Sequence, residues 1–480
     1  MVKNRGESSY SERKKILEPL DEVGLKGFHL KTWLVSGMGF FTDAYDLFII
    51  GMVIAMLAGP WGLTKFQEGL LGSTSLIAAV FGAFIFGKLL DVYGRKAIYG
   101  IELIILIAGA VLSALSTNIN QLMLWRFVLG IGIGGDYATS AIIMSEYSNR
   151  KDRGKLVSMV FSMQSLGLLV GPLITMGLLS TSLSIGMDWR ILLLLGAIPP
   201  LFVIYYRRKI AETPRFALGV NGDVHTARQT VMTLTDTETI PKVDGKNVAI
   251  KQSPWMLLTN IRYLLLVIGT ALSWFLLDWA FYGNSISSSA IMASVAGKGA
   301  SLYTTALYTF IIFAVFAFPG YWIATALMDK IGRKFIQVLG FLVMGISYMM
   351  LAFIPAIMSS IIPFMAVYGI SYFFIEFGPN VTTFVYPSEV FPVNVRGIGD
   401  GMAAGAGKFG AFLGTLLFPV LLIMIHLNGL FAFLGIISLI GVVETIILLP
   451  EPKHKSLEEA SGEHLLEQPS EILNMEDELS

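Results

Sequence analysis

The stretch RFVLGIGIGGDYATSAIIMSE, residues 126–146, decides between two kinds of protein. Gly130, Gly132 and Gly135 spell G-x-G-x-x-G, the spacing with which a strand-to-helix turn holds a dinucleotide. That interpretation requires a strand before the motif and a helix after it, within a βαβ unit. Here the motif lies inside a long apolar run, where glycines let two helix backbones touch. We therefore expect a tight helix crossing, and Asp136 directly after it needs a separate explanation.

The composition of the whole chain favours a membrane as its solvent. Of the 480 residues, 54% are hydrophobic and 14% are charged, whereas ordinary soluble domains have about 25% charged residues. So few charges cannot cover a large protein in water, and lipid is the expected surrounding. The formal net charge is zero, which argues against a nucleic-acid partner. The chain has no cysteine, which excludes zinc–thiolate sites, and residues 1–31 show no signal peptide.

Apolar runs of about 20 residues, the length that crosses the hydrocarbon layer, recur along the chain. They predict an all-α membrane protein of about twelve transmembrane helices in two pseudo-symmetric six-helix bundles. The expected spans are 32–58, 67–90, 96–117, 120–146, 154–180, 188–207, 257–289, 301–328, 334–355, 358–386, 397–425 and 429–449. Around them we expect an N-terminal segment 1–31, bundles 32–207 and 257–450, a linker 208–256 and a mobile tail 451–480. Basic residues concentrate in alternate loops, which places those loops and both termini in the cytoplasm.

Two loop motifs occur once in each half. DVYGRK (91–96) matches DKIGRK (329–334), and Glu146 precedes Arg153-Gly154 by the spacing that separates Glu389 from Arg396-Gly397. The repetition indicates a duplication, and parallel six-helix repeats hold their substrate between the halves. These charges could serve only to orient the helices, but we favour a charge latch that locks neighbouring helices in one state. The expected latch residues are Asp91, Arg95, Glu146, Arg153, Asp329, Arg333, Glu389 and Arg396.

Several carboxylates lie inside the predicted spans, where a charge costs about 2.5–3.5 kcal/mol even on a lenient scale. Asp43 and Asp46 are i and i+3 and share one face of the first helix. We expect them to carry a proton or cation, the alternative being a position near an aqueous mouth. Asp136 either carries a proton or pairs with a basic residue.

The seventh span, WFLLDWAFYGN (274–284), places Trp274, Asp278 and Tyr282 on one helical stripe. Trp and Tyr in spans commonly form interfacial belts, but the carboxylate between them favours a polar ligand. Further polar groups within spans are the amides Gln164 and Asn380 and the cation Lys408.

The paired loop motifs and the six-plus-six layout resemble the major facilitator superfamily over residues 32 to 450. GGDYATSAIIMSE, SMQSLG, WFLLDWAFYGN, FGPNVTTFVYPSEVFP and GKFGA resemble its phosphate:proton symporter branch. The resemblance implies phosphate contacts from Tyr137, Gln164, Trp274, Asp278, Tyr282 and Asn380. It also implies a proton pathway through Asp43, Asp46 and Asp136, with Lys408 near them. Glu376, where the branch tends to have Asn, and Ala138, where it has Pro, depart from the pattern, and Glu376 could alter substrate or proton stoichiometry.

These features together predict a proton-coupled inorganic phosphate importer that works by alternating access. We expect a monomer in the plasma membrane whose partners are phosphate, protons and lipid, without nucleic acid, cofactor or metal. Asp278 would accept a hydrogen bond from dihydrogen phosphate, which sulfate cannot donate at neutral pH. The alternatives are a sugar or organic-ion transporter on the same scaffold and a nutrient sensor that does not transport. An enzyme is not expected, because the histidines are scattered and neither G-x-S-x-G nor a P-loop occurs.

Overall fold

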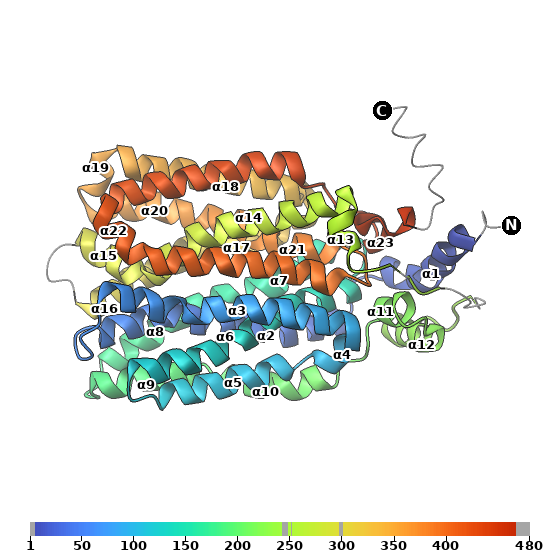
Figure 1. The fold of residues 1–480 in the computed structure, drawn as a ribbon, viewed down its shortest axis with the longest axis horizontal. Helices are drawn as coiled ribbons and strands as arrows, with labels where there is room; N and C mark the ends of the chain where they lie inside the picture. Colours follow the sequence, from blue (N-terminus) through green and yellow to red (C-terminus); the bar gives the residue numbers. More distant parts are fainter. Residues whose placement is uncertain (1–4, 242–247, 251, 297–300, 467–480) are drawn as a thin grey trace.

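The computed structural model describes residues 5–241, 248–250, 252–296 and 301–466 as a bundle of long, roughly parallel helices (Figure 1). The first half contains α1 (Arg5–Glu22), α2 (Gly27–Leu57), α3 (Lys65–Tyr93), α4 (Arg95–Ile98), α5 (Ile101–Ala114), α6 (Ile119–Tyr147), α7 (Arg153–Ser162), α8 (Gln164–Leu179), α9 (Ile185–Leu195) and α10 (Ile198–Arg208). The connecting segment contains α11 (Pro214–Gly219), α12 (Val224–Thr235) and α13 (Met256–Thr259).

The second half repeats this arrangement. It contains α14 (Ile261–Ile286), α15 (Ser288–Ala296), α16 (Leu302–Ile312), η1 (Phe313–Ala317), α17 (Phe318–Ile331), α18 (Arg333–Phe353), α19 (Pro355–Met358), α20 (Ile361–Ile375), η2 (Glu376–Asn380), α21 (Val381–Val390), α22 (Arg396–Leu448), α23 (Leu457–Ser461) and η3 (Glu463–Leu465). Helices α1, α11, α12 and α23 lie at one end of the bundle, which we call the termini end (Figure 1).

The number of membrane-spanning helices agrees with the number predicted from the sequence when the long helix α22 is counted as two. Eleven helical stretches among the described residues are long and apolar enough to cross a membrane. The last of them, α22, runs for 53 residues, but His426 has a non-helical backbone (φ 57°, ψ 174°) that breaks it. A break at this position yields the separate eleventh and twelfth spans that the apolar pattern predicts. The all-α, twelve-helix expectation is therefore confirmed.

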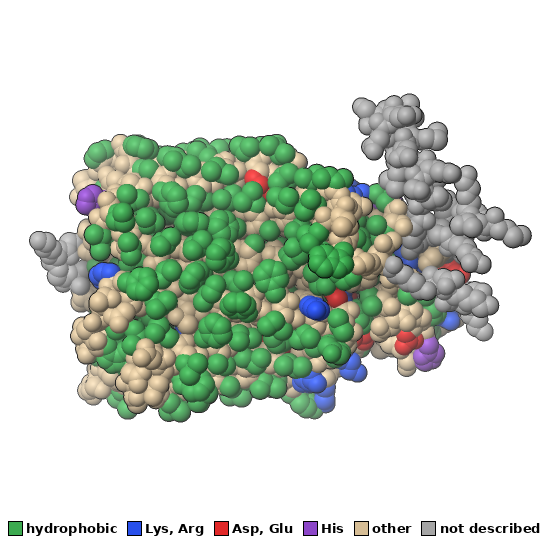
Figure 2. All heavy atoms as spheres, viewed as in Figure 1, with side chains coloured by type: hydrophobic (Ala, Val, Ile, Leu, Met, Phe, Trp, Pro, Cys, Tyr) green, Lys and Arg blue, Asp and Glu red, His purple; other side chains and the backbone are tan. Residues whose placement is uncertain are grey.

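The outer surface of the bundle is apolar along most of its length. Hydrophobic side chains cover the face in Figure 2, and charged side chains gather toward the termini end. Large apolar residues such as Ile362 and Phe202 are 78% and 71% exposed. Such exposure is unfavourable in water and suits a hydrocarbon layer.

The glycines of the opening stretch allow close helix packing, as expected. A Cβ atom on Gly130 would lie 2.2 Å from the Ser75 carbonyl oxygen, and one on Gly134 would lie 2.0 Å from that of Ala79. On the other side of α6, a Cβ atom on Gly132 would lie 2.6 Å from a carbonyl oxygen of α5. Helix α6 therefore touches α3 and α5 at the backbone, which a larger residue would prevent.

The two D-x-x-G-R-K loops adopt the same backbone conformation. Gly94 follows α3 with φ 92° and ψ 163°, and Gly332 follows α17 with φ 93° and ψ 160°. This positive-φ region disfavours residues that carry a Cβ atom. The shared geometry confirms that the two halves repeat one structural plan.

The segments outside the spans contain short helices of their own. The linker helices α11 and α12 pack with α1 around a small apolar cluster that includes Ile16, Leu218 and Val231. Residues 451–466, assigned from the sequence to a mobile tail, contain α23 and η3, and Leu457 is fully buried. Their order depends on ion pairs to the rest of the molecule, described below. The remainder of that tail lies outside the described residues.

Candidate functional site

Polar side chains from both halves meet in the interior of the bundle. Gln164 of α8 donates to the Tyr137 hydroxyl of α6 (2.6 Å), and Tyr137 shares a hydrogen bond with Tyr282 of α14 (3.1 Å). On the other side, Tyr321 of α17 donates to Gln164 Oε1 (3.1 Å), and Asn380 of η2 donates to Tyr321 (2.8 Å). These contacts form one hydrogen-bonded chain between the two halves.

Lys408 supplies the positive charge of this region. Its Nζ atom donates to Asp278 Oδ2 (3.0 Å) and to the Tyr282 hydroxyl (2.9 Å). The same atom lies 4.0 Å from the centre of the Tyr137 ring and 4.3 Å from that of Tyr282. We call the eight residues of this region the central cluster: Tyr137, Gln164, Trp274, Asp278, Tyr282, Tyr321, Asn380 and Lys408.

Every member of the central cluster is at most 2% exposed. Aromatic rings surround it: Phe384 lies 6.4 Å from Tyr137 and from Trp274, measured between ring centres. Gly407 leaves room for Trp274, because a Cβ atom there would lie 2.4 Å from the Trp274 ring. Such a dry environment strengthens electrostatic interactions and makes unpaired polar atoms costly.

Two polar atoms of the central cluster are nevertheless unpaired. Asp278 Oδ1 and Trp274 Nε1 have no hydrogen-bond partner among the described residues. One accepts and the other donates hydrogen bonds, and both belong to the stripe that the sequence singled out. A buried acceptor and donor without partners are suited to a polar ligand that offers both functions.

A second charged group lies beside the central cluster and explains Asp136. Arg207, in the last turn of α10, contacts both oxygens of Asp136 (2.6 and 3.0 Å) and Glu102 Oε1 (2.8 Å). Ser140 also donates to Asp136 (2.6 Å). Gly39 of α2 makes space for this group, because a Cβ atom there would lie 1.9 Å from Asp136 Oδ2. Two carboxylates thus share one buried guanidinium.

Asp43 and Asp46 are both buried but have different neighbours. Asp43, one turn after Gly39, interacts electrostatically with Asp136, Arg207 and Lys408. Asp46 instead interacts with Arg126, and a Cβ atom on Gly196 would lie 2.3 Å from its Oδ1. Neither carboxyl group has a hydrogen-bond partner among the described residues. Asp43 therefore lies between the Arg207 group and the central cluster.

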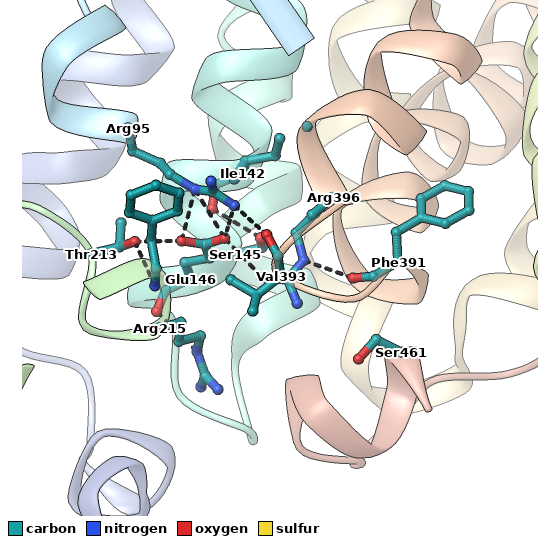
Figure 3. A network of polar contacts seen from close by, with 12 residues as sticks. Arg95, Ile142, Ser145, Glu146, Thr213, Arg215, Phe391, Val393, Arg396 and Ser461 are labelled. Carbon is teal, nitrogen blue, oxygen red and sulfur yellow. Dashed lines mark hydrogen bonds and ion pairs between the residues drawn. The ribbon is translucent and has the colours of Figure 1, made fainter. Parts of the chain in front are cut away.

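The predicted latch residues come together at the termini end as two similar ion-pair groups. In the first, Arg95 contacts Glu146 (2.7 Å) and Asp91 (3.4 Å), and Arg396 of the second half contacts Glu146 (2.8 Å). Figure 3 shows Arg95 and Arg396 directed at Glu146. Asp91 also accepts hydrogen bonds from the Gly397 and Ile398 backbone amides (2.9 and 2.8 Å).

The second group has the same pattern with the halves exchanged. Arg333 contacts Glu389 and Asp329 (both 2.7 Å), and Arg153 of the first half contacts Glu389 (2.8 Å). Asp329 accepts hydrogen bonds from the Gly154 and Lys155 backbone amides (3.1 and 2.7 Å). Each group therefore joins the two halves, and we refer to the two ion-pair groups as the latches.

The segment around α23 covers the latches. Arg215 of α11 pairs with Glu458 and with Asp21 (2.5 Å), and Glu463 pairs with Arg396 (3.4 Å). Burial raises the pKa of Glu463, and repulsion from Glu458 adds to the shift. Burial opposes ionisation of Glu458 too, but the attraction of Arg215 and its hydrogen bonds hold the Glu458 pKa below its ordinary value. The tail thus binds residues of the connecting segment and of the second half.

At the opposite end of the bundle, a cavity of about 310 Å³ lies between the halves. Its lining includes Gly51 and Ala55 of α2, Ile286 of α14, and Thr415 and Phe418 of α22. Ile286 is one helical turn beyond Tyr282 of the central cluster. The cavity therefore approaches the cluster from the side opposite the latches.

The structure brings together all six residues expected to contact phosphate and all eight expected latch residues. Lys408, expected near the proton-pathway aspartates, forms its ion pair with Asp278. Tyr321 and the pairing of Arg207 and Glu102 with Asp136 could not be predicted from the sequence. No local pattern distinguishes Tyr321 from other aromatic residues of the spans, and Arg207 lies in the run YYRRK, which resembles an ordinary basic loop.

Comparison with known proteins agrees with this architecture. The family model described as sugar (and other) transporter matches residues 32–463. Inorganic phosphate transporter 1-11 of Oryza sativa subsp. japonica is 34% identical, over 93% of this chain and 90% of its own. The repressible high-affinity phosphate permease of Neurospora crassa is 32% identical, over 94% of this chain and 90% of its own.

Among solved structures, the major facilitator superfamily proton:xylose symporter XylE, bound to 6-bromo-6-deoxy-D-glucose, matches with a TM-score of 0.77. The alignment covers 90% of this chain and 98% of that one, at 19% identity. At this identity the match establishes the fold.

Proposed function

Because the chain belongs to the sugar (and other) transporter family of the major facilitator superfamily, we propose that it imports inorganic phosphate together with protons across the plasma membrane. Relatives named as inorganic phosphate transporters support this substrate. The central cluster supports it independently, since amide, phenol and indole donors with one lysine suit the oxygens of a small oxyanion. Transporters of this family are not enzymes.

The observation that carries the proposal is that neither Asp278 Oδ1 nor Trp274 Nε1 forms a hydrogen bond of normal geometry among the described residues, although the two side chains interact with each other. Dihydrogen phosphate has P–OH groups that donate to Asp278 Oδ1 and oxygens that accept from Trp274 and Lys408. Lys408 already offsets the charge of Asp278 (3.0 Å), so the carboxylate does not repel the anion at full strength. Sulfate at neutral pH has no proton to donate and leaves Asp278 Oδ1 unpaired, which disfavours its binding.

The proton is carried, in this proposal, by the aspartates beside the central cluster. Asp43, Asp136 and Glu102 are three buried carboxyl groups near Arg207, and the other cation that interacts with Asp43, Lys408, already pairs with Asp278. An uncompensated negative charge in this position is costly, so protons must neutralise the excess. A neutral Asp43 makes the surroundings of Lys408 more favourable for an anion, whereas an ionised one repels it.

The order of steps in the transport cycle follows from which end of the bundle faces the cytoplasm and which faces outside. The excess of basic residues in the loops places the termini end in the cytoplasm, so the cavity faces outside. Protons and phosphate enter through the cavity, the latches separate, and loss of the proton to the cytoplasm repels the anion. We expect Asp46 and Asp136 to take part in this pathway and the protein to work as a monomer.

Uptake of radiolabelled phosphate into proteoliposomes tests the proposal. We expect uptake to rise with an inward proton gradient, and unlabelled phosphate to compete where sulfate and glucose do not. Competition by glucose would favour a sugar transporter. Saturable binding with no uptake would favour a nutrient sensor. Either result would overturn the proposal.

A further inference from the structure

Glu376 is a buried acid at the edge of the central cluster to which the mechanism above gives no role. It begins η2, a π-helical turn, and is fully buried. Gly378 within this turn has a non-helical backbone (φ −106°, ψ −113°), and a Cβ atom on Gly340 of α18 would lie 2.4 Å from the Gly378 Cα atom. Single π-turns in helices frequently occur at functional sites. This one presents Glu376 and Asn380 together.

No cation within the described part of the chain compensates Glu376. Its Oε2 atom accepts a hydrogen bond from Asn380, and its Oε1 atom has no partner among the described residues. Lys408, the cation of the cluster, is paired with Asp278. The titratable groups that interact with Glu376 are Asp278 on α14, Tyr321 on α17, Tyr348 on α18 and Tyr372 on α20. On α21, Tyr386 and Glu389 interact with Arg333 of the latch instead.

The hydrogen bonds of Asn380 connect Glu376 to the phosphate site. An amide has two N–H donors, and Asn380 directs its Nδ2 atom at Glu376 Oε2 and at the Tyr321 hydroxyl (2.8 Å). To donate to phosphate, Asn380 must release one of these partners. Release of an ionised Glu376 leaves a buried charge without its amide donor and with only the weaker Tyr321 contact, whereas release of a neutral carboxyl group costs much less.

The alternative rearrangement leads to the same requirement. If Asn380 released Tyr321 instead, an ionised Glu376 would remain beside the incoming anion and repel it. A proton on Glu376 removes both obstacles: the loss of the amide donor to a buried charge, and the repulsion between that charge and phosphate. Phosphate binding and protonation of Glu376 therefore favour each other, and the coupling is reciprocal.

We propose that Glu376 takes up a proton when phosphate binds and releases it with phosphate, so that it adds one proton to each transport cycle. The inference rests on the proposed function and extends it to a residue outside the Asp43 pathway. The only bond that changes is the carboxyl O–H bond, which forms with a proton from the outer solution and breaks on release.

The test compares Glu376→Gln with the wild-type protein. Glutamine imitates the neutral carboxyl group and still accepts a hydrogen bond from Asn380. The matched control is Glu444→Gln, because Glu444 is also a buried acid of the second half but contacts Ser273 (2.5 Å) outside the central cluster. Two quantities are measured: the number of protons per phosphate, from reversal potentials in proteoliposomes, and the pH dependence of phosphate binding to the purified protein.

We expect Glu376→Gln to transport one proton fewer per phosphate. A ligand that binds with one proton loses affinity about tenfold per pH unit above the titration of the group. The slope of log Kd against pH should therefore be smaller by one in Glu376→Gln than in the wild type. The titration of phosphate itself contributes equally to the slopes of the wild type and of the variant, so it does not affect the difference between them. Glu444→Gln should keep the wild-type ratio and slope.

An unchanged ratio and slope in Glu376→Gln would overturn the inference. A wild-type protein that carries no phosphate would instead refute the proposed function, so the two failures are distinguishable. Should glutamine prevent folding, Glu376→Asp retains a titratable carboxyl group and should retain the slope; loss of the slope in that variant would also overturn the inference. Infrared difference spectra of the wild type on phosphate addition should gain a protonated-carboxyl band that shifts in Glu376→Asp.

Discussion

The latches and the central cluster are both buried and both join the two halves, but they differ in how many cations each carboxylate contacts. Glu146 and Glu389 each contact two arginines, one from each half. In the central cluster Asp278 has one cation, and one of its oxygens has no partner among the described residues.

This difference indicates that the two regions have different roles. A network in which each glutamate contacts an arginine from both halves stabilises one arrangement of the helices. A buried site with unused donors and acceptors becomes fully paired only when a ligand enters. We therefore assign the conformational preference to the latches and the substrate preference to the central cluster, and four experiments can break or sharpen this division.

The largest expected effect is a complete and reversible block of transport. Ser162 of α7 and Thr325 of α17 belong to different halves, and their hydroxyl oxygens are 2.8 Å apart. Because the chain has no cysteine, the pair Ser162→Cys and Thr325→Cys would form a single disulfide that holds the halves together near the latches. Oxidation should abolish phosphate uptake, and reduction should restore it.

Each single cysteine variant, treated with the same oxidant, is the control and should keep its uptake. Full uptake by completely cross-linked protein would show that the halves do not separate at this end.

Asp278→Asn should reduce phosphate uptake by about 100-fold. Removing one partner of a buried pair costs about 3–5 kcal/mol, because Lys408 is left buried without a counter-ion. The double variant Asp278→Asn with Lys408→Met removes that unpaired charge. It should regain thermal stability, measured as Tm in detergent, while phosphate uptake stays as low as in Asp278→Asn.

The double variant separates folding from function. If it regained uptake along with stability, Asp278 would have a structural role only.

Glu389→Gln and Glu146→Gln should each loosen the termini end by similar amounts. Each glutamate contacts arginines from both halves, so loss of its charge weakens the cross-half contact in either latch. We expect labelling of a single Ser162→Cys reporter by a maleimide to accelerate about tenfold, which corresponds to about 1.4 kcal/mol. Asp278→Asn in the same background should accelerate it much less, and equal acceleration would contradict the division between the regions.

The smallest effect concerns the tail. Glu458→Gln weakens the Arg215 contact but leaves the Arg215–Asp21 pair (2.5 Å) in place, so we expect only a local increase in hydrogen exchange of residues 457–466. The pKa of Glu458 lies below its ordinary value of 4.5. A lowered carboxyl pKa stabilises the docked tail above that value, and the stabilisation is lost as the pH falls below it.

Hydrogen exchange at pH 7 and pH 4 measures both effects. Glu463 titrates with the opposite sign, because its pKa is raised, so the comparison between the two proteins isolates Glu458. After correction for intrinsic rates, lowering the pH should accelerate exchange of the tail more in the wild type than in Glu458→Gln. An equal difference in both proteins would assign the pH effect to another group.

Much of the central cluster followed from the sequence because helical periodicity is local. Trp274, Asp278 and Tyr282 share a stripe whatever their surroundings, and the apolar run around them fixes their depth. The latch residues could be predicted for another reason, since the same spacing occurs in both halves. Asp136 was ambiguous, because its partner Arg207 is distant in the chain and lies in a run that resembles an ordinary basic loop.

The sequence by itself determined the solvent, the number of spans, the duplication and the acids that lipid burial makes costly. These properties depend on composition and on spacing along one helix. Only the tertiary structure decided which charge pairs with which: Lys408 with Asp278, Arg207 with Asp136 and Glu102, and Glu376 with no cation among the described residues. Such pairings arise where helices from separate parts of the chain cross. Whether a carboxylate and a cation lie within contact distance at such a crossing decides whether the carboxylate is compensated or needs a proton.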